Sequence, residues 1–89
     1  MLQETLTIVN KLGLHARAAA KLVKLASTFG SEIYLKRKQR EVNGKSIMGV
    51  MLLAAGKGTE VELSVSGEDE EEAFKKIVEL IKSGFGEEE

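Results

Sequence analysis

The chain of 89 residues contains no cysteine, no proline and no tryptophan. Without cysteine it can hold neither a disulfide framework nor a thiolate metal site, and the absence is compatible with a reducing cytoplasm. Without proline, the breaks between regular elements fall to glycine. The longest purely apolar run, residues 50–55, is too short to cross a bilayer, and residues 1–10 lack the pattern of a signal peptide. We therefore expect a soluble, cytoplasmic protein without membrane insertion.

Charge is nearly balanced in total but unevenly distributed along the chain. The net charge is −1, with nine Lys and Arg against three Glu in residues 1–45, and four Lys against eleven acids in residues 46–89. If the fold gathers the basic side chains on one side, that surface would attract an acidic partner or a phosphate group. The side chains in question are Lys11, Arg17, Lys21, Lys24 and Lys45.

The length suits one small core, so residues 1–89 are expected to form a single domain. Alternation of polar and apolar residues predicts strands at residues 5–9, 32–36, 40–43 and 59–66, and helical periodicity predicts helices at 16–29, 47–55 and 68–82. The order β-α-β-β-α-β-α favours an α+β fold. We predict an open-faced two-layer sandwich, in which a four-stranded antiparallel sheet carries three helices on one face.

The only histidine in the chain, His15, lies between Gly13 and the start of the first predicted helix. A helix N-terminus presents unpaired amide N–H groups and roughly half a positive charge, so it attracts anions. The same field disfavours the imidazolium form of His15 and leaves a ring nitrogen free to attack at neutral pH. Arg17 adds a planar guanidinium that suits phosphate oxygens.

These groups together fit phosphoryl transfer through a phosphohistidine at His15. Such a transfer needs in-line positioning and charge stabilisation of the transferred group, which the Arg17 side chain and the backbone N–H groups of Ala16 and Arg17 would supply. The chemistry requires no cofactor and no metal. The residues alone leave a second interpretation open, because a lone polar residue at a helix start is more often an N-cap than a nucleophile.

Two motifs, GLHARAAA at residues 13–20 and GKSIMGVM at residues 44–51, resemble the histidine-containing phosphocarrier protein (HPr) family of the bacterial phosphoenolpyruvate-dependent phosphotransferase system. The resemblance covers essentially the whole chain in the same element order. It implies that His15 accepts a phosphoryl group from phosphorylated enzyme I and passes it to EIIA-type domains, while Arg17 supports the phosphate. It also implies a phosphoryl-transfer intermediate rather than a stand-alone enzyme, and we expect a monomer.

The sequence departs from the family pattern at two positions near His15. The family usually has proline where this chain has Ala18, and a small polar residue is common where this chain has Leu12. Alanine keeps the helix but does not preset φ in its first turn, and leucine removes one hydrogen bond near the ring. We expect altered transfer rates rather than lost function.

Ser46 precedes the second predicted helix, so an N-cap role follows from its position alone. The resemblance adds a regulatory role, because the family serine that matches Ser46 is phosphorylated in some bacteria by HPr kinase/phosphorylase. A phosphate at this helix N-terminus, near Lys45, would hinder a second phosphoryl group or an acidic enzyme from reaching His15.

The helix after Ser46 carries more apolar surface than one buried side needs. Val50 and Leu53 lie roughly opposite Ile47, Met48 and Met51, so one group can face the core while the other stays exposed or, alternatively, is also buried. Exposed methionine suits several partners because it repacks easily. The resemblance implies a docking surface shared with the first helix, formed by Ala16, Ala20, Lys24, Ile47, Met48 and Met51.

Three alternatives compete with the carbon-side carrier. The basic segment KRKQR at residues 36–40 would fit a small RNA-binding module, but only Tyr34 could stack on bases, so no nucleic acid is expected. A purely regulatory relative would lack the histidine. NKLG at residues 10–13 and SGF at 83–85 resemble carriers of the nitrogen-related branch, whereas GKSIMGVM resembles carbon-side carriers of sugar transport, which we favour.

Overall fold

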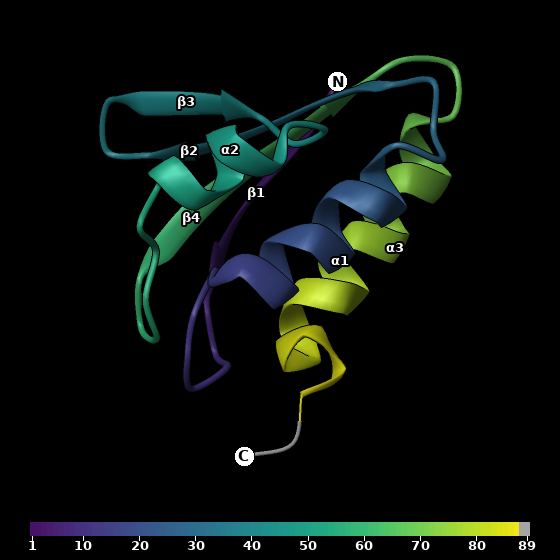
Figure 1. Ribbon diagram of the computed structural model, residues 1–89. Helices are drawn as coiled ribbons and strands as arrows, with labels where there is room; N and C mark the ends of the chain where they lie inside the picture. Colours follow the sequence, from purple (N-terminus) through teal and green to yellow (C-terminus); the bar gives the residue numbers. More distant parts are fainter. Residues whose placement is uncertain (88–89) are drawn as a thin grey trace.

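The computed structural model describes residues 1–87, and residues 88 and 89 at the end of the acidic tail lie outside the described part. Four strands form one antiparallel sheet, and three helices cover one of its faces (Figure 1). The predicted fold class and element order are thus confirmed. The elements are β1 (Leu2–Thr7), α1 (Ala16–Ala26), β2 (Glu32–Arg37), β3 (Arg40–Asn43), α2 (Ile47–Leu52), β4 (Glu60–Ser66), α3 (Glu70–Lys82) and a 3₁₀ turn, η1 (Gly84–Gly86).

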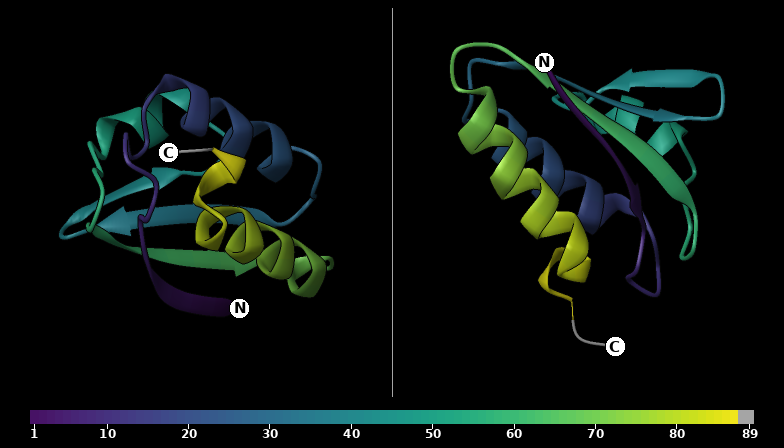
Figure 2. Two further views of the ribbon diagram at one scale, coloured as in Figure 1. Left: turned by 90° about the horizontal axis from the view of Figure 1, so that it is seen from below. Right: turned by 180° about the vertical axis from the view of Figure 1, so that it is seen from behind.

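The strand order in the sheet is β1-β4-β2-β3, so β4 and β2 are central and β1 and β3 form the edges. Figure 2 shows the sheet as one layer and the helices as the other. As predicted, Val61, Leu63 and Val65 of β4 point into the core, and all three are essentially inaccessible to solvent. Helix α3 packs against β1 and β4, and α1 packs against both α2 and α3.

The first strand begins earlier than the predicted range of residues 5–9. Its first residues are mostly polar because β1 is an edge strand whose side chains find partners outside the core. The Gln3 amide donates to the Ser64 hydroxyl over 3.1 Å, and the Glu4 carboxylate lies 3.6 Å from the Lys82 ammonium. These polar residues hide the alternation on which the prediction depended.

All three helices are shorter than predicted, and α2 shows why most clearly. It ends at Leu52, shortly before Ala54 adopts a left-handed φ of 50°. The Arg37 guanidinium donates to the carbonyl oxygens of Leu53 and Ala54 over 2.9 and 3.1 Å, and Arg40 donates to that of Leu52 over 3.2 Å. Two arginines of the β2–β3 hairpin therefore satisfy the carbonyl groups that the end of a helix leaves unpaired.

Asp69 is the N-cap residue of α3, but its side chain bonds another segment instead of capping its own helix. It accepts hydrogen bonds from the backbone N–H groups of Gly30 and Ser31 over 2.9 and 3.0 Å, and from the Ser31 hydroxyl. These bonds hold the pKa of Asp69 below its ordinary value, the Ser31 hydroxyl being the largest cause. Asp69 thereby ties α3 to the loop between α1 and β2.

Candidate functional site

His15 is the N-cap residue of α1, at the end of a loop that is anchored to the segment after α2. Gly13 has a left-handed φ of 67°, and the backbone N–H of Leu14 donates to the Ala55 carbonyl oxygen over 2.9 Å. His15 then takes extended backbone angles, and its ring Nδ1 accepts a hydrogen bond from the Arg17 backbone N–H over 3.3 Å. The N-cap interpretation is confirmed, and the same contact brings a ring nitrogen to the helix N-terminus.

The segment that follows α3 also reaches this site, although it lies near the other end of the sequence. After α3, the turn η1 buries the Phe85 side chain in the core, with Phe85 in a left-handed conformation at φ 61°. The Lys21 ammonium of α1 donates to the Phe85 carbonyl oxygen over 2.8 Å. The two contacts hold the segment after α3 beside the start of α1, as both views in Figure 2 show.

Glu87 places its carboxylate against the histidine ring. Its Oε2 lies 2.6 Å from His15 Nε2, and its Oε1 accepts from the Asn10 amide over 2.9 Å. Because Nδ1 accepts from a backbone N–H, the proton of the neutral ring resides on Nε2, which donates to Glu87. The geometry therefore leaves the lone pair on Nδ1, at the helix N-terminus.

The pKa of Glu87 lies below its ordinary value, so its carboxylate is ionised at neutral pH. The hydrogen bond from Asn10 is the largest cause, the hydrogen bond from His15 and the charge of Lys21 act in the same direction, and partial burial opposes them. Glu87 and Asn10 were not found from sequence. Their positions, 77 residues apart, carry no shared pattern that would have placed them together.

Basic side chains surround a surface hollow of about 810 Å³ beside His15. Arg17, Lys11 and Lys21 line it, whereas Lys24 and Lys45 do not, so the fold gathers three of the five expected basic residues. The hollow is also lined by Leu12, Ala16, Gly86 and Glu87, and the Leu12 side chain is exposed. Positive charge at a helix N-terminus favours a phosphate group here. Among residues 1–87, no group of His, Cys, Asp and Glu side chains could hold a metal ion.

Ser46 is the N-cap of α2, as predicted. Its hydroxyl accepts from the Gly49 backbone N–H over 3.1 Å, and its own N–H donates to the Asn43 carbonyl oxygen over 3.0 Å. The neighbouring Lys45 ammonium donates to the Phe29 carbonyl oxygen over 2.7 Å. Lys45 is thus already hydrogen-bonded to the segment that follows α1.

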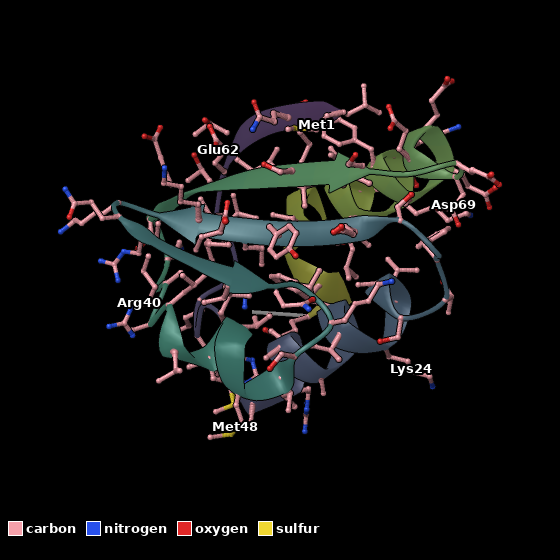
Figure 3. The ribbon with its side chains drawn as sticks, turned by 90° about the horizontal axis from the view of Figure 1, so that it is seen from above. Met1, Lys24, Arg40, Met48, Glu62 and Asp69 are labelled. Carbon is pink, nitrogen blue, oxygen red and sulfur yellow. The ribbon has the colours of Figure 1, made fainter. Side chains whose placement is uncertain are left out.

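The predicted division of apolar residues in the second helix is confirmed. Val50 and Leu53 are buried, whereas Ile47, Met48 and Met51 are 40%, 68% and 39% exposed. Leu52, 59% exposed, extends this surface and was not predicted. Ala16, Ala20 and Lys24 of α1 are exposed as well. Figure 3 shows Met48 and Lys24 pointing away from the sheet, on the helical side of the molecule.

The opposite, open face of the sheet offers little for stacking nucleic-acid bases. Tyr34 pairs with Ser64 and Asn43 in the sheet register and is half-buried there. Two of the phenylalanines, Phe29 and Phe85, belong to the core. Within residues 1–87, no helix is long and apolar enough to cross a membrane.

Comparison with known proteins agrees with this geometry. Residues 2–83 match the family model described as the PTS HPr component phosphorylation site. A phosphocarrier protein HPr from Cupriavidus necator is 55% identical over 87 residues, which are 98% of each chain. The crystal structure of HPr-C-His from Thermoanaerobacter tengcongensis superposes with a TM-score of 0.95 at 52% identity, over 100% of both chains. The crystal structure of an HPr dimer from the same organism superposes with a TM-score of 0.78 at 52% identity, over 98% of this chain and 100% of that chain.

The family model covers most of the chain, and the relatives span its length at more than half identity. The chain therefore belongs to the HPr family. It is a phosphocarrier protein of the phosphotransferase system.

Proposed function

We propose that residues 1–89 act as one carrier domain in which His15 Nδ1 accepts a phosphoryl group from phosphorylated enzyme I and passes it to EIIA-type domains. The observation that carries this proposal is the orientation of the ring. Nδ1 faces the Arg17 N–H at the start of α1, while Nε2 is held by Glu87. The unprotonated ring nitrogen is thus the one beside the hollow's positive charge.

The transfer balances without moving a proton. The Nδ1 lone pair forms the new N–P bond, and the bond between phosphorus and the donor breaks with its electron pair staying on the donor. Nε2 keeps its hydrogen, so the phosphorylated ring carries a positive charge. The Glu87 carboxylate, 2.6 Å from Nε2, stabilises that charge, and it does so more strongly in the product than in the neutral ring.

Arg17 and the helix N-terminus act on the transferred group itself. Phosphoryl transfer spreads negative charge over three equatorial oxygens, and fixed donors aimed at them lower the barrier. The Arg17 guanidinium lines the hollow, and the backbone N–H groups of Ala16 and Arg17 belong to the first turn of α1. When phosphorus occupies Nδ1, the Arg17 N–H that now bonds the ring can bond a phosphate oxygen instead.

Labelling tests the proposal directly. The protein is incubated with enzyme I and labelled phosphoenolpyruvate, and the label is mapped and tested for acid lability. Acid-labile label on His15 is expected, with none taken up by a folded His15→Ala variant. Label on a serine, no label, or uptake by His15→Ala would overturn the assignment.

The exposed surface of α1 and α2 is proposed to dock both partners. Helix α1 packs against α2, and Ala16, Ala20 and Lys24 of the first helix are exposed, as are Ile47, Met48 and Met51 of the second. Exposed large apolar side chains together with a basic group such as Lys24 suit acidic enzymes that present an apolar patch. We propose a cytoplasmic monomer, and sedimentation at micromolar concentration tests that state against a dimer like that of the Thermoanaerobacter tengcongensis protein.

Ser46 is proposed to act as a brake, phosphorylated by HPr kinase/phosphorylase. Its hydroxyl lies at the N-terminus of α2, among the exposed apolar residues of the proposed docking surface. A phosphate there adds nearly two negative charges and repels an acidic partner. Phosphorylation of Ser46 by purified kinase and ATP, followed by slower uptake at His15, supports this role.

The physiological branch is proposed to be the carbon-side one, on the GKSIMGVM motif around Ser46. The alternative, a carrier of the nitrogen-related branch, is suggested by NKLG and SGF, the segments that here bring Asn10 and Phe85 to the site. Uptake rates from the carbon-side and nitrogen-related forms of enzyme I discriminate the two. Faster uptake from the nitrogen-related form would favour the alternative.

A further inference from the structure

Asn10 lies immediately behind the site and is 1% exposed. Its amide nitrogen donates both hydrogens, one to the Gly13 carbonyl oxygen over 2.8 Å and one to Glu87 Oε1 over 2.9 Å. Both acceptors lack hydrogens, so the orientation of the amide is fixed. Its oxygen Oδ1 is buried and has no hydrogen-bond partner within the described residues.

An unpaired buried amide oxygen is unfavourable, and interiors contain few of them. The hydrogen bond to the Gly13 carbonyl oxygen alone does not explain an asparagine at this position. A side chain with a single donor hydrogen could make that bond and close the loop. The feature that demands the –NH₂ group is the second acceptor, the Glu87 carboxylate. The unpaired Oδ1 of Asn10 is therefore tolerated because the amide nitrogen of the same side chain bonds two acceptors at once.

The second bond leads to the reacting ring. Asn10 holds Oε1 of Glu87, and Oε2 of the same carboxylate holds His15 Nε2 over 2.6 Å. The chain of contacts continues through the ring to Nδ1 and the Arg17 N–H. A carboxylate fixed at one oxygen can rotate little at the other, so the Asn10 amide limits how the imidazole can turn.

We propose that Asn10 is a positioning residue for phosphoryl transfer, which fixes the Glu87 carboxylate so that His15 keeps its hydrogen on Nε2 and presents Nδ1. The inference rests on the proposed transfer at His15 and extends it to a residue that touches neither the phosphoryl group nor the ring. Metal-binding histidines show the same logic, since a carboxylate partner sets their tautomer. The hydrogen bond from Asn10 also lowers the pKa of Glu87, which keeps the partner charged.

The tautomer of His15 provides a readout that a merely structural role would not change. In unphosphorylated protein labelled with ¹⁵N at histidine, the shifts of Nδ1 and Nε2 in alkaline buffer report which nitrogen carries the hydrogen. The wild type is expected to show hydrogen on Nε2. Asn10→Ala and Glu87→Ala should each raise the Nδ1–H fraction. Asn43→Ala, which removes an exposed asparagine that caps the turn before Ser46, should not.

A double-mutant cycle on phosphoryl uptake separates positioning from loop closure. Asn10→Ala should slow uptake about tenfold, as expected when one hydrogen bond to a charged group is lost. In the Glu87→Ala background the same change should alter the rate by less than about twofold, because Asn10 then has no carboxylate to hold. Equal slowing in both backgrounds, or an unchanged tautomer in Asn10→Ala, would overturn the inference.

A second variant covers the case in which Asn10→Ala does not fold. Asn10→Asp then replaces it, because aspartate keeps the shape but offers no hydrogen and repels Glu87, and the same outcomes apply. If the wild type takes up no label at His15, the proposed function fails. The tautomer measurement needs no phosphoryl donor, so it tests the contact between Asn10 and Glu87 independently.

Discussion

The backbone N–H of Leu14 donates to the Ala55 carbonyl oxygen over 2.9 Å, which joins the loop before His15 to the loop after α2. A Cβ atom added at Gly13 would lie only 2.5 Å from the same Ala55 carbonyl oxygen. The segment that carries His15 and the segment that follows α2 therefore pack closely, backbone against backbone, at Gly13 and Leu14. The entry of the chain into α1 depends on a glycine at this point.

Gly13→Ala should lower the free energy of unfolding by more than about 2 kcal/mol, because it adds a left-handed alanine and an overlap with the Ala55 carbonyl. Gly58→Ala is the matched control, since Gly58 has a φ of 88° but no atom within 4 Å of where its Cβ atom would lie. Gly58→Ala should lower the free energy of unfolding by about 1 kcal/mol. Urea unfolding of both variants provides the measurement, and equal losses would contradict the role of the contact.

Arg17→Ala should slow phosphoryl uptake about a hundredfold, the loss typical of one donor to developing negative charge. Its side chain is exposed, so the free energy of unfolding should change by less than about 0.5 kcal/mol. The uptake rate of Arg17→Lys should lie between the rates of the wild type and of Arg17→Ala, because lysine keeps the charge without the planar fork. Rapid-quench kinetics and thermal unfolding report the two effects. A large loss of stability at an unchanged rate would argue against the assigned role.

Ser46→Ala should lower the free energy of unfolding by about 1 kcal/mol, since it removes the acceptor of the Gly49 N–H. Ser46→Asp keeps an N-cap acceptor and should retain most of the stability, but its negative charge should slow uptake from enzyme I. The slowing should weaken as ionic strength rises. Uptake by Ser46→Asp at the wild-type rate in low salt would remove the support for an electrostatic brake.

The lowered pKa of Asp69 predicts a pH dependence of stability. The folded state binds this proton less readily than the unfolded state, whose pKa is near the ordinary 3.8. The stabilisation is complete above that value and is lost as the pH falls through it towards the folded pKa. Asp69→Asn, which weakens the bonds to Gly30 and Ser31, should be clearly less stable than the wild type at pH 7, and the gap should narrow below pH about 4. Urea unfolding across this range shows whether it does.

The central part of the fold could be predicted because its signals are local. Strand β4 lies between β1 and β2 in the sheet, and one of its faces packs on the core. That face had to be apolar, which produced the clear alternation in the sequence. The ends of elements were less predictable, because distant residues determine them. Arg37 and Arg40 bond the carbonyl groups at the end of α2, and Asp69 is occupied by Gly30 and Ser31.

The candidate site was only half visible in the sequence for the same reason. His15, Ala16 and Arg17 are neighbours in one motif, and the physics of a helix N-terminus points to them. Glu87 reaches His15 across 72 residues, guided by the burial of Phe85 and the bond from Lys21. Neither contact has a periodic signature, so the group that orients the ring emerged only from the structure.

The most direct test of the account asks which ring nitrogen carries the phosphorus. The protein is labelled with ¹⁵N at His15, phosphorylated through enzyme I and phosphoenolpyruvate, and the phosphorus–nitrogen coupling is assigned by NMR. We expect the coupling at Nδ1, with hydrogen retained on Nε2 beside Glu87. Coupling at Nε2, or phosphorus on any other residue, would contradict it.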